Sequence, residues 1–147
     1  MSGASATRRP VVFREGESRC FGCGSLNPLG LQLRFFETDD GIEMDWTAPA
    51  HVEGAPGIVH GGIQGTVLDE ALCMTAYAKR ATPVVTGELT VRYRKPVPVA
   101  VPLLVRARIV EEDARSFVIA GAIHLAASGE TLTEGRGRFF AAKGATP

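Results

Sequence analysis

The residues between His60 and Asp69 have the types and the spacing needed for chemistry on a carbonyl group. Gly61 and Gly62 follow His60 at the expected start of a helix, and Asp69 comes about two turns later. Backbone N–H groups at a helix N-terminus favour an anion or a developing oxyanion, and glycines let another molecule approach them closely. A nearby carboxylate can act as a general base or as a nucleophile. The stretch therefore contains the parts of an acyl-transfer site.

The helix that must position these residues is expected over residues 62–79. Lys79 and Arg80 lie in its last turn and Pro83 follows shortly after, as is typical of a helix end. Its apolar face, at helical spacing, consists of Ile63, Val67, Ala71, Met74, Thr75 and Ala78. The neighbours of Asp69 on the other side are all small: Gly62, Gly65, Cys73 and Ala76. Such a helix can pack on both sides, which would enclose the carboxylate.

Six segments alternate apolar and polar residues with the period of a β-strand. Two precede the helix, over residues 31–35 and 42–46, and Thr38–Gly41 between them predicts a hairpin turn. Four follow it, over residues 84–94, 103–110, 117–127 and 131–142. Gly135 and Gly137 in the last segment indicate a bulge or a close backbone approach. A single helix over an antiparallel sheet is an α+β architecture, and its uncovered parts favour a dimer.

Length and charge limit the remaining possibilities. The 147 residues predict one domain over residues 19–147, preceded by a flexible arm over residues 1–18. Lys plus Arg and Asp plus Glu both number 16, which argues against a nucleic-acid partner. No apolar run is long enough to span a membrane, and none follows Arg8 and Arg9 as in a secretory signal. We therefore expect a cytoplasmic protein without a membrane partner.

The three cysteines do not resemble a disulfide framework, because their number is odd. Cys20 and Cys23 form a C-x-x-C motif, but no second such motif follows. His51, His60 and Cys73 could complete a metal site only at a spacing that matches no zinc pattern. We interpret Cys20 and Cys23 as small buried thiols and expect no metal. Cys73 is interpreted as a buried thiol rather than a nucleophile.

Three stretches together resemble a known family. They are His60-Gly61-Gly62 with Asp69 nine residues after the histidine, the segment 88–96, and the lead-in that runs from residues 20–24 to 27–31. They resemble the hotdog-fold acyl-CoA thioesterases of the PaaI-like and 4-hydroxybenzoyl-CoA thioesterase type, over about residues 20–142. The resemblance implies a hotdog fold, in which an antiparallel sheet of about five to six strands wraps a long central helix.

The resemblance also implies a catalytic site shared between two subunits. Asp69 of one chain would be the general base or nucleophile, and the backbone N–H of Gly61 in the partner would polarise the thioester carbonyl. His60 would shape the turn, and Thr86 would help to place the water. Gly62 would contribute to substrate binding.

Three further positions are expected to bind substrate. Gly54 occupies a position where many family members carry Asn or Gln. Arg94 and Lys95 would bind the phosphates of coenzyme A, or else belong to a solvated strand face. Apolar residues of the helix and the hairpin line an acyl pocket or only fill the core: Phe35, Trp46, Val67, Leu68, Leu72 and Met74.

The expected function is hydrolysis of an acyl-CoA to free acid and CoA, by a homodimer or homotetramer, with no cofactor besides the CoA of the substrate. An acyl-CoA sensor or carrier on the same fold is the alternative, which Gly54 favours. A hydratase would need a histidine–carboxylate pair, which His60 does not obviously provide. In the plainer alternative, Asp69 only pairs with an arginine. Glu70 is expected to form a salt bridge or a dimer contact rather than to act as a second base.

Overall fold

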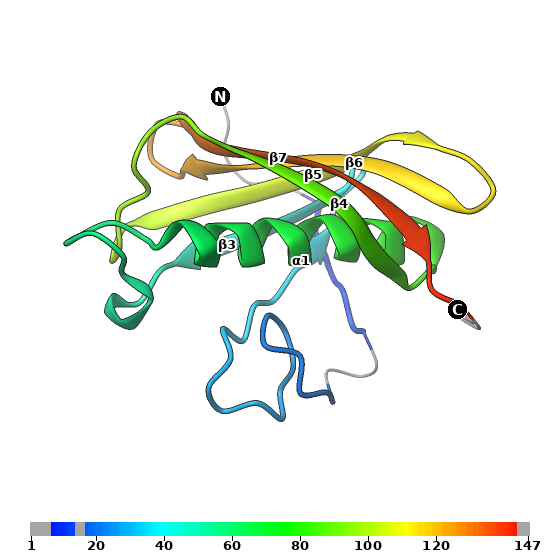
Figure 1. Cartoon of the computed structure of the whole chain (residues 1–147), viewed down its shortest axis with the longest axis horizontal. Coiled ribbons are helices and arrows are strands. Elements are labelled where there is room, and N and C mark those ends of the chain that lie inside the picture. Colours follow the sequence, from blue (N-terminus) through cyan, green and yellow to red (C-terminus); the bar gives the residue numbers. More distant parts are fainter. Residues whose placement is uncertain (1–6, 14–16, 144–147) are drawn as a thin grey trace.

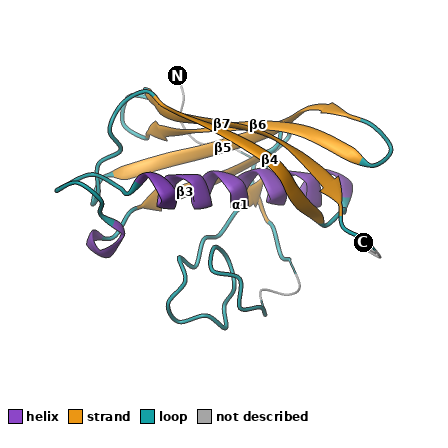
Figure 2. Ribbon diagram, in the orientation of Figure 1, coloured by secondary structure: helices purple, strands orange, loops and turns teal. Residues whose placement is uncertain are grey.

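The computed structural model describes residues 7–13 and 17–143, in which one long helix lies across a single antiparallel sheet (Figures 1 and 2). The helix α1 spans Gly61–Arg80, and a short 3₁₀ helix spans Ala50–Val52. The strands are β1 (Arg9–Pro10), β2 (Phe36–Glu37), β3 (Ile42–Thr47), β4 (Val84–Tyr93), β5 (Pro102–Glu112), β6 (Ser116–Leu125) and β7 (Thr131–Ala141). This arrangement confirms the predicted α+β hotdog architecture.

The strand order places β4 at an edge of the sheet. The order is β1-β2-β3-β5-β6-β7-β4, and every pairing is antiparallel. After α1 the chain therefore continues into an edge strand of the sheet, and among the described strands β4 pairs only with β7. Over the described residues the sheet has seven strands, slightly more than the predicted five to six.

The additional strand lies in the stretch predicted to be a flexible arm. Residues 1–6 and 14–16 of that stretch lie outside the described residues. Within the described part, β1 pairs with β2, and Arg8 bridges to β3 through ion pairs with Glu43 (3.0 Å) and Asp45 (2.6 Å). A strand of two residues is too short to produce a readable alternation.

Residues 31–35 do not form the predicted β-strand, although the predicted pattern of buried residues is confirmed. Leu33 and Phe35 are buried as expected, but only Phe36–Glu37 pairs with β3. The backbone N–H groups of Leu31 and Leu33 instead bond the carbonyls of Phe21 and Gly22. This stretch is therefore fastened to the Cys20–Gly24 turn. Figure 1 shows the resulting loop on the side of α1 away from the sheet.

The helix rests on two glycines that face each other across β6 and β7. Gly121 and Gly135 are register partners, and we call this pair the glycine seat. A Cβ at Gly121 would lie 2.9 Å from Leu72 Cδ1, and one at Gly135 would lie 3.2 Å from Leu68 Cδ1. The predicted close backbone approach is thus confirmed at Gly135, whereas neither Gly135 nor Gly137 lies at a bulge: the register shifts in the two ladders of β7 lie between Thr86 and Glu88 of β4 and between Ile123 and His124 of β6.

The apolar residues proposed for a pocket are all buried in the core: Phe35, Trp46, Val67, Leu68, Leu72 and Met74. They belong to one buried cluster of the single chain and so fill its core, and Met74 also lines a small cavity. The buried face of α1 is wider than the predicted stripe and also includes Gln64 and Ala76. No helix within residues 7–13 and 17–143 is long and apolar enough to cross a membrane.

Candidate functional site

His60 fixes the start of α1. It is the N-cap residue, and its Nδ1 accepts a hydrogen bond of 2.9 Å from the Gly62 N–H. The helix therefore begins at Gly61, one residue before the predicted start. None of the described residues accepts a hydrogen bond from the Gly61 N–H. This donor lies at the positive end of the helix dipole, where it can polarise a carbonyl oxygen.

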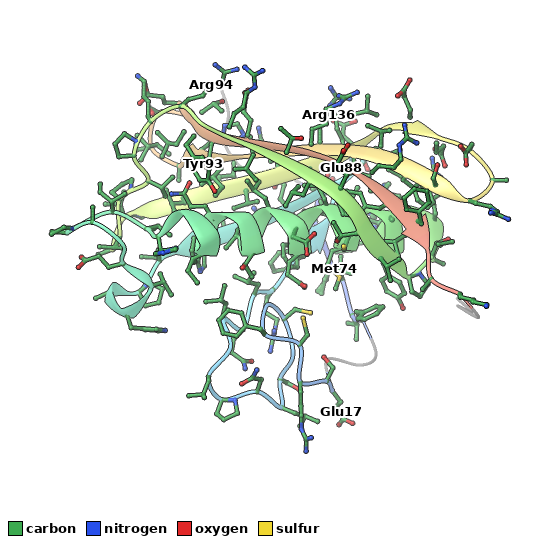
Figure 3. The ribbon with its side chains drawn as sticks, viewed as in Figure 1. Glu17, Met74, Glu88, Tyr93, Arg94 and Arg136 are labelled. Atoms are coloured by element: carbon green, nitrogen blue, oxygen red, sulfur yellow. The ribbon has the colours of Figure 1, made fainter. Side chains whose placement is uncertain are left out.

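Tyr93, at the end of β4, contacts the start of α1 at Gly61. The sequence analysis missed this residue. Its hydroxyl donates a hydrogen bond of 2.8 Å to the Gly61 carbonyl, and its ring would be 3.5 Å from a Cβ at Gly61. Figure 3 shows Tyr93 between the sheet and the N-terminal end of α1. Its position in the Leu89–Val91–Tyr93 alternation, with a polar tip on the helix-facing side, is the signal that could have identified it.

The loop before the helix is braced by its own backbone. The His60 N–H bonds the Val52 carbonyl (2.9 Å), and the Gly54 N–H bonds the Ile58 carbonyl (2.8 Å). A Cβ at Gly54 would lie 3.0 Å from His60 Cα, so this position backs directly onto the cap residue. An Asn or Gln here would have to displace His60. Glycine at this position is therefore part of the tight loop.

Gln64 is a second residue that the sequence analysis missed. It is buried, its Nε2 donates to the Val59 carbonyl (2.9 Å), and its Oε1 accepts from the Thr133 hydroxyl (2.6 Å). The pair fastens the first turn of α1 to β7 and to the loop. Because Thr133 lies 69 residues away in the sequence, only the proximity of Gln64 to the apolar position Ile63 indicates its burial.

Asp69 and Thr86 meet as a pair between α1 and the start of β4. The Thr86 hydroxyl donates a hydrogen bond of 2.6 Å to Asp69 Oδ1. Among the described residues no Arg or Lys forms an ion pair with Asp69, so the alternative of a simple Asp–Arg pair does not hold within one chain. Thr86 lies directly before the register shift at Gly87, and this shift bends the strand at this point.

Cys73 borders the pair but is not poised for attack. Its Sγ lies 3.7 Å from Thr86 Oγ1. Burial, followed by the charge of Asp69, raises the pKa of Cys73 to about 12. The side chain is therefore a neutral thiol near pH 7, which agrees with its interpretation as a buried thiol.

Gly61 and Asp69 of one chain cannot act on the same carbonyl. They are eight residues apart on one helix, which separates them by about 12 Å along its axis at about 1.5 Å per residue. The structure thus brings Asp69 to Thr86, and brings Gly61 and Gly62 to His60 and Tyr93, but it keeps these two groups apart within the chain.

Arg94 and Lys95 are exposed and paired with glutamates. Arg94 Nε lies 2.5 Å from Glu134 Oε1, and Lys95 Nζ pairs with Glu130. Figure 3 shows Arg94 on the side of the sheet away from α1. Arg94 therefore lies on the opposite side of the sheet from Asp69 and from the helix start.

Comparison with known proteins places these features in a family. The family described as "Thioesterase superfamily" matches residues 56–131, which is just over half of the chain and includes His60, Gly61, Asp69 and Thr86. The curated acyl-coenzyme A thioesterase THEM4 of Rattus norvegicus is 30% identical over 70 residues, which are 48% of this chain and 30% of that protein. The chain thus matches less than a third of the length of this relative.

Solved structures show the same fold. A thioesterase superfamily protein is 29% identical with a TM-score of 0.70, over 77% of this chain and 58% of its own. A Bacillus halodurans protein whose crystal structure contains CoA is 30% identical with a TM-score of 0.66, over 76% of this chain and 74% of its own. The E. coli PaaI protein, at 19% identity and a TM-score of 0.65 over 72% and 80% of the two chains, shares the fold. The chain belongs to the thioesterase superfamily and has its hotdog fold.

Proposed function

We propose that this protein hydrolyses an acyl-CoA thioester to a free acid and CoA. The observation that carries the proposal is the hydrogen bond from Thr86 to Asp69, which places a carboxylate and a hydroxyl together beside the helix. Two findings on relatives support it: THEM4 is named an acyl-coenzyme A thioesterase, and the Bacillus halodurans structure contains CoA. The proposed chemistry uses no cofactor besides the CoA of the substrate.

Each group in the proposed site has a distinct task. Asp69 acts as general base or nucleophile, and Thr86, while it donates to Asp69, offers its oxygen lone pairs to the attacking water. The Gly61 N–H polarises the thioester carbonyl and stabilises the oxyanion that forms on attack. The sulfur of CoA then leaves as the thiol, and the carboxylic acid remains.

A two-fold axis through β4 would complete the site. β4 is an edge strand and runs from Val84 to Tyr93. If two copies pair antiparallel about the middle of this strand, its start lies beside the end of the partner strand. The Thr86–Asp69 pair of one chain would then approach the partner copy of the Tyr93–Gly61 contact. We propose a homodimer, or a homotetramer built from such dimers, with each site shared between two chains.

Apolar side chains at this edge support the dimer. Val85 of β4 and Phe140 of β7 are register partners, and they are 56% and 43% exposed. An unpaired edge strand next to exposed apolar side chains is a surface that stable proteins usually cover.

The test of the reaction is thiol release from a panel of short, medium, long and aryl acyl-CoAs, after subtraction of the protein's own three cysteines. Loss of the Asp69 carboxylate in Asp69→Asn should raise the barrier by about 3 kcal/mol, which lowers kcat more than about 100-fold. Asp39→Asn, at an exposed turn, is the matched control. Thiol release that persists at the wild-type rate in Asp69→Asn would refute the mechanism.

The shared site is tested by subunit mixing. Gly61→Pro removes the N–H donor and adds a ring beside Tyr93; it is compatible with the helix start, because proline is favoured at the first helical position and the extended His60 (φ −54°, ψ 137°) suits a residue before proline. In a random mixture of Asp69→Asn and Gly61→Pro chains, half of the dimers are mixed and each has one intact site. About one quarter of the wild-type activity should therefore return. If no activity returns, the two groups do not come from different chains.

A binding protein on the same fold is the second candidate. The absence of an amide side chain at Gly54 favours it, because the packing against His60 gives the thioester no side-chain partner there. It predicts tight binding of acyl-CoA without thiol release. Water addition to an enoyl-CoA would instead indicate a hydratase.

A further inference from the structure

Three atoms of types that bind metal ions lie close together where the N-terminal segment, at its Cys20–Gly24 turn, packs on α1. The sulfur atoms of Cys20 and Cys23 and a carboxylate oxygen of Glu70 all lie within 4.8 Å of one another. The Cys20 thiol donates a hydrogen bond of 3.2 Å to Glu70 Oε1. Neither cysteine is in a disulfide. The sequence could not show this cluster, because Glu70 lies 50 residues after Cys20.

The turn that carries the two cysteines is held by its backbone. The Gly24 N–H bonds the Cys20 carbonyl (2.9 Å), and the carbonyls of Phe21 and Gly22 accept hydrogen bonds from the segment that follows. Gly22 packs directly on the carboxylate side chain, since a Cβ there would lie 2.2 Å from Glu70 Cγ. The backbone hydrogen bonds of the turn and the packing of Gly22 on Glu70 therefore hold the two sulfur atoms and the carboxylate close together.

Glu70 has an oxygen that its surroundings do not satisfy. Oε2 is buried and has no hydrogen-bond partner among the described residues. Within the same residues no Lys, Arg or His forms an ion pair with Glu70, so the predicted salt bridge is wrong for the single chain. A buried carboxylate oxygen without a donor or a cation is costly, and native proteins rarely retain one.

We propose that Cys20, Cys23 and Glu70 bind one zinc-class divalent cation that fastens the N-terminal segment to α1 beside Asp69. Two thiolates and one carboxylate are ligands that zinc accepts, and C-x-x-C is a common spacing for two of its ligands. In a tetrahedral zinc site the ligand atoms are about 3.7 Å apart, so the observed cluster, with Cys20 Sγ 3.2 Å from Glu70 Oε1 and all three atoms within 4.8 Å of one another, needs only small shifts. The role is structural, and no step of the proposed hydrolysis passes through the ion.

The fourth coordination position would face a small cavity. This cavity of about 140 Å³ is lined by the three proposed ligands together with Cys73, Met74 and Tyr77, among others. It has room for a water molecule. Cys73 is not assigned as a ligand, because it is outside the three-atom cluster and its sulfur contacts Thr86.

The first test measures zinc in the full chain, purified without an affinity tag under reducing conditions. After removal of metal with a chelator, zinc is titrated against a chromophoric competitor, and bound zinc is counted by mass spectrometry. We expect about one zinc per chain. Glu70→Gln and Cys20→Ser should each lose at least about ten-fold in zinc affinity, whereas Cys73→Ser, the matched control, should keep the wild-type value. Far-UV circular dichroism checks that each variant retains its fold.

A second test needs no variant. Zinc should protect Cys20 and Cys23 of the wild-type protein from alkylation and leave the rate at Cys73 unchanged, as read by peptide mass spectrometry. Stoichiometric zinc that survives Cys20→Ser combined with Cys23→Ser would overturn the proposal. Absence of zinc binding, or equal alkylation rates with and without zinc, would overturn it as well. Neither readout depends on thioester hydrolysis, so failure of this proposal is distinguishable from failure of the proposed function.

Discussion

The hydroxyl of Thr86 donates a hydrogen bond of 2.6 Å to the carboxylate of Asp69, across 17 residues of sequence. One partner lies on α1 and the other at the start of an edge strand, so the contact exists only when the helix lies correctly on the sheet. A hydrogen bond to a charged group contributes about 1.5–3 kcal/mol. This contact orients one carboxylate oxygen, and in the proposed mechanism the other oxygen acts on the substrate or the water.

Replacement of Thr86 tests that orientation. Thr86→Val keeps the shape of the side chain but removes the donor, and we expect kcat for acyl-CoA hydrolysis to fall about ten-fold or more. Thr86→Ser retains the hydroxyl and should retain most of the activity. Thr90→Val, at an exposed position of the same strand, is the control for the change in β4. Equal kcat values for Thr86→Val and wild type would show that the contact is not used.

Tyr93→Phe should lower the activity because it weakens the contact that positions the start of α1. The substitution keeps the ring beside Gly61 but removes the hydroxyl that donates to the Gly61 carbonyl. We expect a loss of about 1 kcal/mol in unfolding free energy and a several-fold decrease in kcat. Tyr77→Phe, which keeps its edge-to-face contact with Phe13, serves as the control. Steady-state kinetics and urea denaturation measure the two effects. An unchanged kcat would show that Tyr93 does not contribute to the proposed site.

Two glycine-to-alanine changes should shift stability in opposite directions. Gly65 lies within α1, and a Cβ there would meet nothing within 4 Å, so Gly65→Ala should stabilise by about 0.5–1 kcal/mol. In Gly121→Ala the Cβ would lie 2.6 Å from the Arg106 carbonyl oxygen, which should destabilise by about 1–3 kcal/mol. Urea denaturation at a fixed protein concentration checks both values. A Gly121→Ala protein as stable as the wild type would contradict the packing described for the glycine seat.

The turn between β5 and β6 should make stability depend on pH. Asp113 Oδ1 accepts hydrogen bonds of 2.9 Å from the N–H groups of Arg115 and Ser116, and these bonds lower the pKa of Asp113. A depressed folded-state pKa stabilises the protein above the unfolded value of about 3.9, and this contribution is lost as the pH falls through the folded value. The gap in Tm between wild type and Asp113→Asn should therefore be largest near pH 7.

That gap should close in acid, below about pH 4. Asp40→Asn, in the exposed turn between β2 and β3, is the control substitution at another aspartate. Thermal melts of the three proteins between pH 3 and pH 7 provide the comparison, at roughly one-unit intervals around the ordinary aspartate pKa. A gap that widens as the pH falls would have the wrong sign for a carboxylate whose pKa is lowered by folding.

The long elements could be predicted because their patterns are local. Predicted residues 62–79 became α1 at Gly61–Arg80, and the four later strand segments became β4 to β7. The alternation at residues 31–35 correctly predicted that Leu33 and Phe35 are buried. It could not predict that their backbone bonds to the Cys20 turn, because alternation reports burial and not the hydrogen-bond partner.

The site was predicted only where a residue type was diagnostic. His60, Gly61 and Asp69 stood out by their spacing, and the family resemblance pointed to Thr86. Tyr93 was read as one more residue of an alternating strand, although its hydroxyl reaches Gly61. Long-range side-chain contacts of this kind depend on how the helix lies on the sheet, which local sequence patterns do not report.

The glycine seat also determines the geometry of the proposed site. Because Leu72 and Leu68 lie against Gly121 and Gly135 with no side chain between them, these two leucines of α1 pack directly on the backbone of β6 and β7. The distance of Asp69 from the start of β4 is thus an indirect result of two missing side chains. Added volume at the seat would lift the helix and open the Thr86–Asp69 contact without touching either residue. A change remote from the reacting atoms would then alter the reaction rate by moving α1 as a rigid rod.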